Sequence, residues 1–127
     1  MGTEALVSID IDNGRDVVDA LDRAGKAPNV ALWVRLPDYE DWRLLMASDH
    51  LNQNSEFEGY SEINEAIKAS NIPIHRWPTV FLRSMKDPMI QELRRDFAQY
   101  EDNYGRRLGG YCYGGKYFED AIVYRIR

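Results

Sequence analysis

The chain has 127 residues, near the common size of one domain, with 44% hydrophobic and 29% charged residues. This composition excludes a disordered chain, and the length is sufficient to bury a core without a metal or disulfide staple. The net charge of −5 disfavours a protein whose main partner is a nucleic-acid backbone.

Cysteine content and hydropathy indicate where the protein acts. Cys112 is the single cysteine, so no intramolecular disulfide can form and no oxidising compartment is indicated. The N-terminus lacks a basic segment followed by an apolar run, and no apolar stretch approaches ~18 residues. We therefore expect one domain over residues 1–127, in the cytoplasm, without a membrane span.

The first predicted element is a helix that Asp10 or Asp12 caps and that runs to about Ala24. Gly25 follows it as a stop signal. Small and apolar residues recur at helical spacing and predict one buried stripe: Gly14, Val17, Val18, Leu21 and Ala24.

Residues 30–36 and 42–48 are predicted to be strands of an antiparallel hairpin, joined by a turn at residues 37–41. A one-residue slip of this hairpin would place Arg43 in the core. The predicted register therefore pairs Leu36 with Trp42, Val34 with Leu44, and Leu32 with Met46. These six side chains then form one apolar face.

The middle of the chain is predicted to contain a polar loop at residues 49–59, a helix over about 60–70 and a short strand at 79–82. Asp87 and Pro88 form a typical cap and first turn of a third helix, which we expect to reach about residue 104. The buried stripe predicted for this helix is Ile90, Leu93, Phe97, Tyr100 and Tyr104.

The C-terminal segment is predicted to be a second hairpin. Tyr113 and Lys116 flank a Gly114-Gly115 turn of type I′, and a bulge is expected near residues 119–120. The chain is therefore predicted to be α+β, with a mostly antiparallel sheet of about five strands and three helices in the order α-β-β-α-β-α-β-β.

Several short runs of residues resemble those of an uncharacterised family of bacterial proteins of similar length. The runs are Ala31-Leu32-Trp33, Leu36-Pro37, Asp41-Trp42-Arg43-Leu44, Glu119-Asp120-Ala121 and Tyr124-Arg125. The resemblance covers most of the chain except residues 49–59. It implies a small bacterial protein without a known activity, and it assigns no functional residue.

Motifs for catalysis and for cofactors are weak in this sequence. His50 and His75 stand in different segments without the spacing of a metal site, and Asp49 beside His50 fits a solvated loop. Cys112 in a strand is expected to be a small buried hydrophobe, and no glycine-rich phosphate loop is present. We therefore predict no cofactor, no metal and no catalytic residue, and we regard enzymatic activity as the less favoured class.

The outer face of the first hairpin is the most informative feature. The predicted register opposes Ala31 to Ala47, Trp33 to Leu45, and Arg35 to Arg43, a combination that resembles interface hot spots. Two readings stay open at this point, since either one of the chain's own helices or a partner can cover this face.

We therefore hypothesise a non-enzymatic interaction module that forms a homodimer through a sheet face or edge. The alternative is a nucleic-acid or anionic-ligand binder, and a small enzyme using acid–base chemistry is a third possibility. Residues 83–127 carry nine basic and seven acidic residues, which keeps the alternative open. The residues predicted to contact a partner are Trp33, Arg35, Arg43, Leu45, Arg125 and Arg127.

Overall fold

A computed structural model describes residue 6 and residues 8–127 of the chain. The α+β class predicted from the sequence is confirmed, with three helices and one more strand than expected. The elements are α1 (Ser8–Arg23), β1 (Val30–Arg35), β2 (Arg43–Ala47), α2 (Glu56–Ala69), the 3₁₀ turn η1 (Ile74–Arg76), β3 (Val80–Leu82), α3 (Pro88–Phe97), β4 (Tyr111–Tyr113), β5 (Lys116–Phe118) and β6 (Asp120–Ile126).

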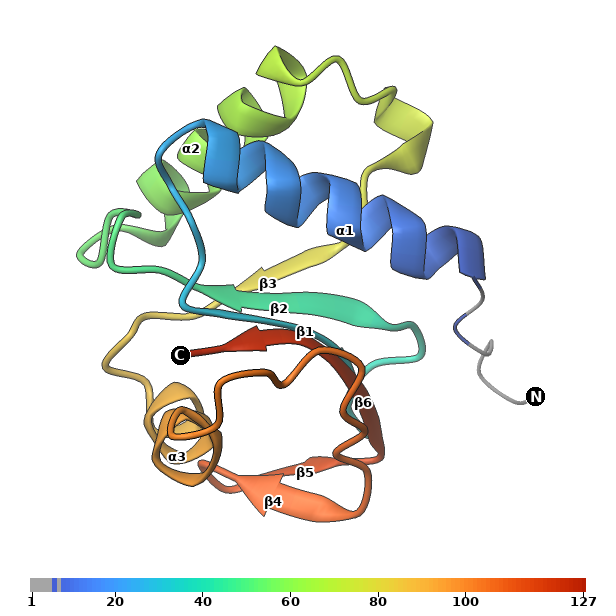
Figure 1. The fold of residues 1–127 in the computed structure, drawn as a ribbon, viewed down its shortest axis with the longest axis vertical. Helices are drawn as coiled ribbons and strands as arrows, with labels where there is room; N and C mark the ends of the chain where they lie inside the picture. The colour runs from blue at the N-terminus through green and yellow to red at the C-terminus, as the bar shows by residue number, and fades with distance from the viewer. Residues whose placement is uncertain (1–5, 7) are drawn as a thin grey trace.

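The main sheet has the strand order β3-β2-β1-β6, and helices cover both of its faces (Figure 1). β1 pairs antiparallel with β2 and with β6, whereas β3 joins β2 in parallel. α1 and α2 lie on one face, and α3 with the β4–β5 hairpin lies on the other. Since both faces are covered, β1 is buried along nearly its whole length.

The buried stripe of α1 agrees with the prediction at Gly14, Val17, Val18 and Leu21. The helix starts at Ser8, earlier than predicted, so Asp10 lies in its first turn, where a carboxylate interacts favourably with the helix dipole. It ends at Arg23, and the Lys26 N–H closes the last turn by donating to Leu21 O.

The register predicted for the first hairpin is wrong by one residue. Leu32 faces Leu45, Trp33 faces Leu44, and Val34 faces Arg43. Arg43 is nevertheless not buried in the core, because this residue stands at the end of the ladder and its side chain remains 28% exposed. With both faces apolar, the hydrophobic pattern does not distinguish the two registers.

Helix boundaries in the middle of the chain also differ from those predicted. α2 begins at Glu56, inside the stretch expected to be loop, because the Ser55 hydroxyl accepts from the Glu58 N–H as an N-cap. α3 begins at the expected cap but ends at Phe97, seven residues early. The Asn103 amide donates to Phe97 O and Ile126 O, which turns the chain back and leaves Tyr100 and Tyr104 about half exposed.

The Gly114-Gly115 turn is confirmed, with both glycines at positive φ and Tyr113 paired to Lys116. Where a bulge was expected, the chain instead leaves the hairpin at Glu119 and enters the main sheet as β6. A register shift opposite Ala31 and Leu32 interrupts β6 near Tyr124. This irregularity lets Tyr124 and Arg125, which are consecutive, both contact α1.

Both outer edges of the main sheet have partners. Beside β6, Gly105 donates to Val123 O, Val123 donates to Arg106 O, and Leu108 donates to Ala121 O. Beside β3, the Tyr60 hydroxyl of α2 accepts from the Leu82 N–H at 2.9 Å. Edge pairing of the main sheet is therefore obstructed on both sides.

Candidate functional site

Trp33 and Leu45, predicted to share an exposed partner-binding face, are core residues. Trp33 is 4% exposed and packs with α1 and α2, whereas Leu45 is 0% exposed and packs on the side of α3. The corrected register places the two side chains on opposite faces of the sheet. The predicted patch therefore does not exist as one face, and elements of the chain itself cover both side chains.

The Trp33 indole donates to the Tyr124 hydroxyl at 2.9 Å, and that hydroxyl donates in turn to Ile11 O. Gly14 allows this arrangement, because a Cβ there would collide with both side chains. Burial raises the pKa of Tyr124 to about 12. A phenol with so high a pKa is a structural hydrogen-bonding group rather than an acid–base catalyst at neutral pH.

The four predicted arginines lie at two opposite ends of the sheet. Arg35 pairs in register with Asp120, whereas Arg125 pairs with Ala31 at the other end of β1. β6 lies beside β1 in the sheet, but the antiparallel pairing of these strands places Arg35 and Arg125 at opposite ends. The four arginines therefore do not form one phosphate-binding cluster.

Carboxylates lie near three of these four guanidinium groups. Arg35 lies 3.7 Å from Glu119, and Arg43 lies 3.7 Å from Asp41. The Arg125 guanidinium donates a bidentate pair of hydrogen bonds to the Asp22 carboxylate at 2.8 and 2.9 Å, which lowers the pKa of that carboxyl. Arg127 is the fourth. Its backbone N–H donates to Asn29 O, and its backbone carbonyl accepts from the Arg94 side chain.

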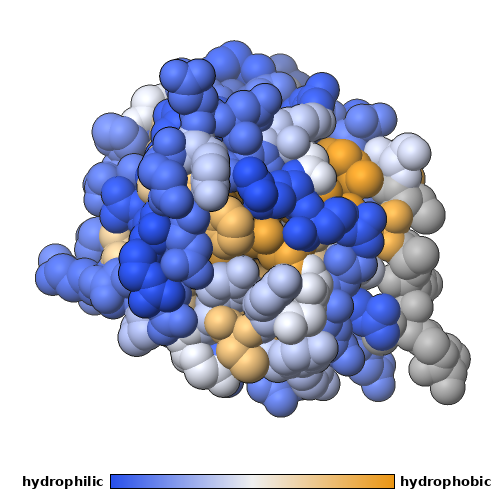
Figure 2. Space-filling model, turned by 60° about the horizontal axis from the view of Figure 1, so that its bottom comes forward, coloured by the Kyte–Doolittle hydropathy of each residue, from blue (hydrophilic) through white to orange (hydrophobic). Residues whose placement is uncertain are grey.

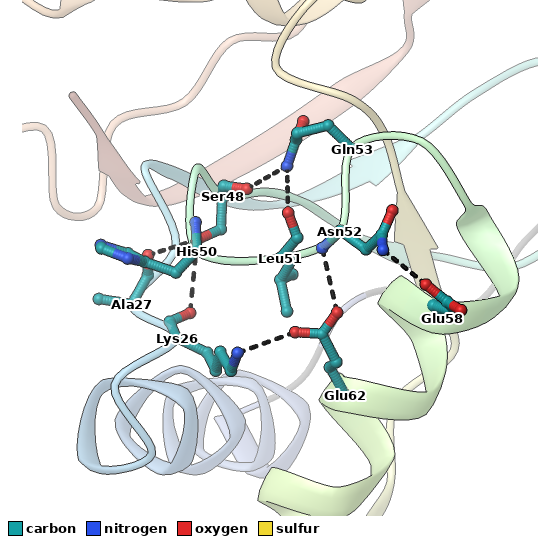
Figure 3. A network of polar contacts seen from close by, with 9 residues as sticks. All are labelled: Lys26, Ala27, Ser48, His50, Leu51, Asn52, Gln53, Glu58 and Glu62. Atoms are coloured by element: carbon teal, nitrogen blue, oxygen red, sulfur yellow. Dashed lines mark hydrogen bonds and ion pairs between the residues drawn. The ribbon is translucent and has the colours of Figure 1, made fainter.

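The polar segment that follows β2 is an ordered network (Figure 3). Ser48 is fully buried and donates to Ala27 O, and the Gln53 amide donates to Ser48 O and Leu51 O. Glu62 of α2 accepts from the Asn52 N–H and pairs with Lys26 at 2.9 Å. This network joins the start of α2 to the end of α1.

Residues considered for catalysis or metal binding lie apart on the surface. His50, His75 and Cys112 are all exposed, so the burial predicted for Cys112 is wrong. Within the described residues, no group of three His, Cys, Asp or Glu side chains has the geometry of a metal site. The same part of the chain contains no helix with the length and hydropathy needed to cross a membrane.

The β4–β5 hairpin has one buried and one exposed face. Tyr113 and Phe118 are buried against α3 and one another, with ring centroids 5.0 Å apart. On the opposite face, Cys112 pairs with Tyr117, which is 47% exposed. Tyr111, 64% exposed, stands at the open end of the hairpin. In Figure 2 this side of the molecule is hydrophilic around its rim, and a band of hydrophobic residues crosses its middle.

A cleft of about 330 Å³ lies beside the tip of this hairpin. Four segments meet there: the β1–β2 turn, the end of β3, the first turn of α3 and the Gly114-Gly115 turn. The residues that line the cleft are Leu36, Asp38, Tyr39, Phe81, Arg83, Asp87, Pro88, Met89, Gly114 and Lys116. Its charged groups comprise two carboxylates and two cations.

A second depression, also of about 330 Å³, lies between α1 and β6. The Arg15 guanidinium sits 4.8 Å from the centroid of the Tyr104 ring, and Tyr104 packs against Tyr124. Arg125 also lines this depression. Arg125 is thus a predicted site residue that lines one of the two hollows.

Sequence reasoning missed both hollows because their residues come from turns and from the segment after α3. Tyr104 was assigned to a helical stripe, although Asn103 and Gly105 on either side of it are signals for a chain reversal. Tyr39 and Phe81 meet only through the parallel pairing of β3 with β2, which no local pattern indicates.

Comparisons with known proteins add no relative. No protein-family profile, curated protein or solved structure matches this chain. The likeness to an uncharacterised bacterial family therefore stays a prediction.

Proposed function

We propose that the protein is a non-enzymatic interaction module that forms a homodimer through the exposed face of the β4–β5 hairpin, in the cytoplasm. The observation that carries this proposal is the contrast between the two hairpin faces, one packed on α3 and one carrying Cys112 and Tyr117. Tyrosine is enriched at protein interfaces because its ring offers a large contact area and its hydroxyl tolerates water.

The second copy of the chain is the favoured occupant for two reasons. β4 and β5 pair only with one another among the described strands, so the hairpin retains free edges that the main sheet lacks. A two-fold contact also covers the same patch on both copies at once. Tyr117 and Cys112 of each copy would then lie close to the symmetry axis.

The test is sedimentation equilibrium at tens of micromolar protein with Tyr117→Lys, and with Tyr100→Lys as the matched control. The two tyrosines are almost equally exposed, at 47% and 49%, but Tyr100 lies outside the hairpin. We expect a dimer for the wild type and for Tyr100→Lys, and a monomer for Tyr117→Lys. A monomeric wild type, or equal effects of both substitutions, would overturn the proposal.

Cys112 gives an independent readout of the same contact. If the hairpin faces meet at a two-fold axis, mild oxidation should join two copies through Cys112, and Cys112→Ala should abolish the covalent dimer. The Tyr117→Lys variant should crosslink far more slowly. Equal crosslinking rates in the two proteins would indicate random collision rather than a specific interface.

Anionic-ligand or nucleic-acid binding is the second candidate function, now at the α1–β6 depression. Its support is the Arg15–Tyr104 stack, since an exposed ring beside a guanidinium suits a nucleobase and its phosphate. Arg15→Ala and Tyr104→Ala should each weaken salt-dependent binding of a fluorescent single-stranded oligonucleotide. Arg95→Ala serves as control, because Arg95 pairs with Asp96 away from the depression.

A further inference from the structure

We infer that the cleft at the hairpin tip binds a small zwitterion of the free α-amino-acid class with an aromatic side chain. This inference concerns a site separate from the Cys112–Tyr117 face and goes beyond self-association. It rests on the construction of the cleft, on the balance of its charges and on the aromatic pair that forms part of its lining.

The tip of the β4–β5 hairpin packs tightly against α3 and forms one wall of the cleft. Gly114 lies so close to α3 that a Cβ at this position would overlap the backbone of Met89. The opposite lining comes from Tyr39 and Phe81, whose rings meet edge to face with centroids 6.1 Å apart. The cleft is therefore built from packed segments, and its volume of about 330 Å³ falls within the range of small-molecule sites.

The two ion pairs that line the cleft differ in strength. Arg83 and Asp87 are 2.7 Å apart, and Asp87 also caps α3 by accepting from the Met89 N–H, so this pair is fixed. Lys116 and Asp38 are 3.7 Å apart, and their side chains are 54% and 69% exposed. Such a loose pair contributes little to stability, and a ligand can separate it at small cost.

Charge balance selects the ligand class. A simple anion would meet the carboxylates of Asp38 and Asp87, and a simple cation would meet Lys116 and Arg83. A zwitterion can instead place its carboxylate at Lys116 and its ammonium group at Asp38, which replaces one loose ion pair with two. An aromatic side chain on the ligand can then pack against the Tyr39–Phe81 pair.

The test is an NMR titration of the full chain with L-phenylalanine, in which the backbone amides of Gly114, Gly115 and Met89 are followed. We expect saturable shifts with a dissociation constant of about 1 mM, since the ligand has only about a dozen heavy atoms. N-acetyl-L-phenylalanine lacks the ammonium group and L-phenylalaninamide lacks the carboxylate. Each derivative should bind at least about tenfold more weakly, a loss typical of one unpaired charged contact.

Protein variants assign the two charges. Lys116→Ala and Asp38→Asn should each weaken L-phenylalanine binding by about tenfold or more, whereas the exposed Lys68→Ala on α2 should leave it unchanged. The absence of saturable shifts, equal binding of the acetylated ligand, or insensitivity to both variants would overturn the inference. Repeating the titration in Tyr117→Lys separates it from self-association, because binding should survive in that variant.

Discussion

Packed elements cover both sides of the main sheet, but the two sides are built differently. On the side of α1 and α2, two helices with clear apolar stripes pack on the sheet, and a Trp33–Tyr124 hydrogen bond is enclosed between them. On the side of α3, one short helix is supplemented by the β4–β5 hairpin and an aromatic cluster of Phe97, Tyr113 and Phe118. Helical periodicity in the sequence specifies the first side. The close packing of the Gly114-Gly115 turn against α3 specifies the second.

This difference has a consequence for function. The helical side buries Trp33 and Tyr124, whereas the hairpin side uses only one face of a two-stranded element for its core. The second face of that element remains at the surface, and its turn forms a wall of the cleft. The cleft therefore lies where a hairpin closes the core, whereas the second depression lies beside α1 on the helical side.

The largest expected effect tests whether both sides are true core. Leu44→Ala removes a side chain from the α1/α2 side, and Leu45→Ala removes its neighbour from the α3 side. Both leucines are 0% exposed, so each substitution should lower the free energy of unfolding by about 2–5 kcal/mol. Urea unfolding measures both. A loss below about 1 kcal/mol for either would show that its side of the sheet is not closed within the monomer.

The next effect compares two glycines, one on each side. Gly114→Ala should cost about 3 kcal/mol, because its φ is +59° and the new Cβ would overlap the backbone of α3. Gly14→Ala should cost less, since the obstacles are side-chain atoms and alanine gains about 1 kcal/mol of helix propensity. Gly115→Ala, at positive φ without a close neighbour, is the control at about 1 kcal/mol. Thermal unfolding should show the largest loss of stability for Gly114→Ala, a smaller loss for Gly14→Ala and the smallest for Gly115→Ala.

Tyr124→Phe examines the buried polar pair that only the α1/α2 side has. It leaves the Trp33 indole N–H without its acceptor and should cost about 1–3 kcal/mol. The pKa of Tyr124 is raised from 10.0 in the unfolded chain to about 12 in the folded protein, so folding favours the neutral phenol. The stability linked to this group is present below pH ~10 and is lost as the pH rises towards about 12.

The pH dependence gives the control for this variant. Tyr124→Phe should show a smaller loss of stability between pH 10 and 12 than the wild type. Some loss should remain, since burial also raises the pKa of Tyr113. Identical alkaline profiles for the two proteins would contradict the burial of the Tyr124 hydroxyl.

The smallest effect concerns the contact between Arg125 and Asp22 that β6 makes with α1. The hydrogen bond from Arg125 lowers the pKa of Asp22, so this pair stabilises the fold above pH ~4 and the contribution is lost as the pH falls further. Asp22→Asn should reduce stability at neutral pH by about 1 kcal/mol, because the pair is partly exposed. At pH ~2 the difference from the wild type should shrink, and a constant difference would argue against an ionic origin.

Features that depend on near neighbours along the chain were predictable from local sequence patterns. The α1 stripe, the Asp87-Pro88 start of α3 and the Gly114-Gly115 turn follow from helical spacing, capping and positive-φ preference. For the same reason the α+β class and most of the element order were predictable. In the candidate sites, Arg125 of the α1–β6 depression was predicted as a contact residue, and the glycine turn and the Asp87-Pro88 helix start beside the cleft were predicted as structural features.

Features that depend on which elements cover one another could not be predicted from local patterns. The register of β1 with β2 could not be determined from the sequence, because both faces of this hairpin are apolar. A period-two pattern specifies the register only when one face is exposed to solvent. The end of α3 depends on the Asn103 amide reaching Ile126 O, and the separation of Arg35 from Arg125 depends on the direction of β6. The burial of Trp33 and the exposure of Cys112 follow from these long-range contacts, which local sequence patterns do not encode.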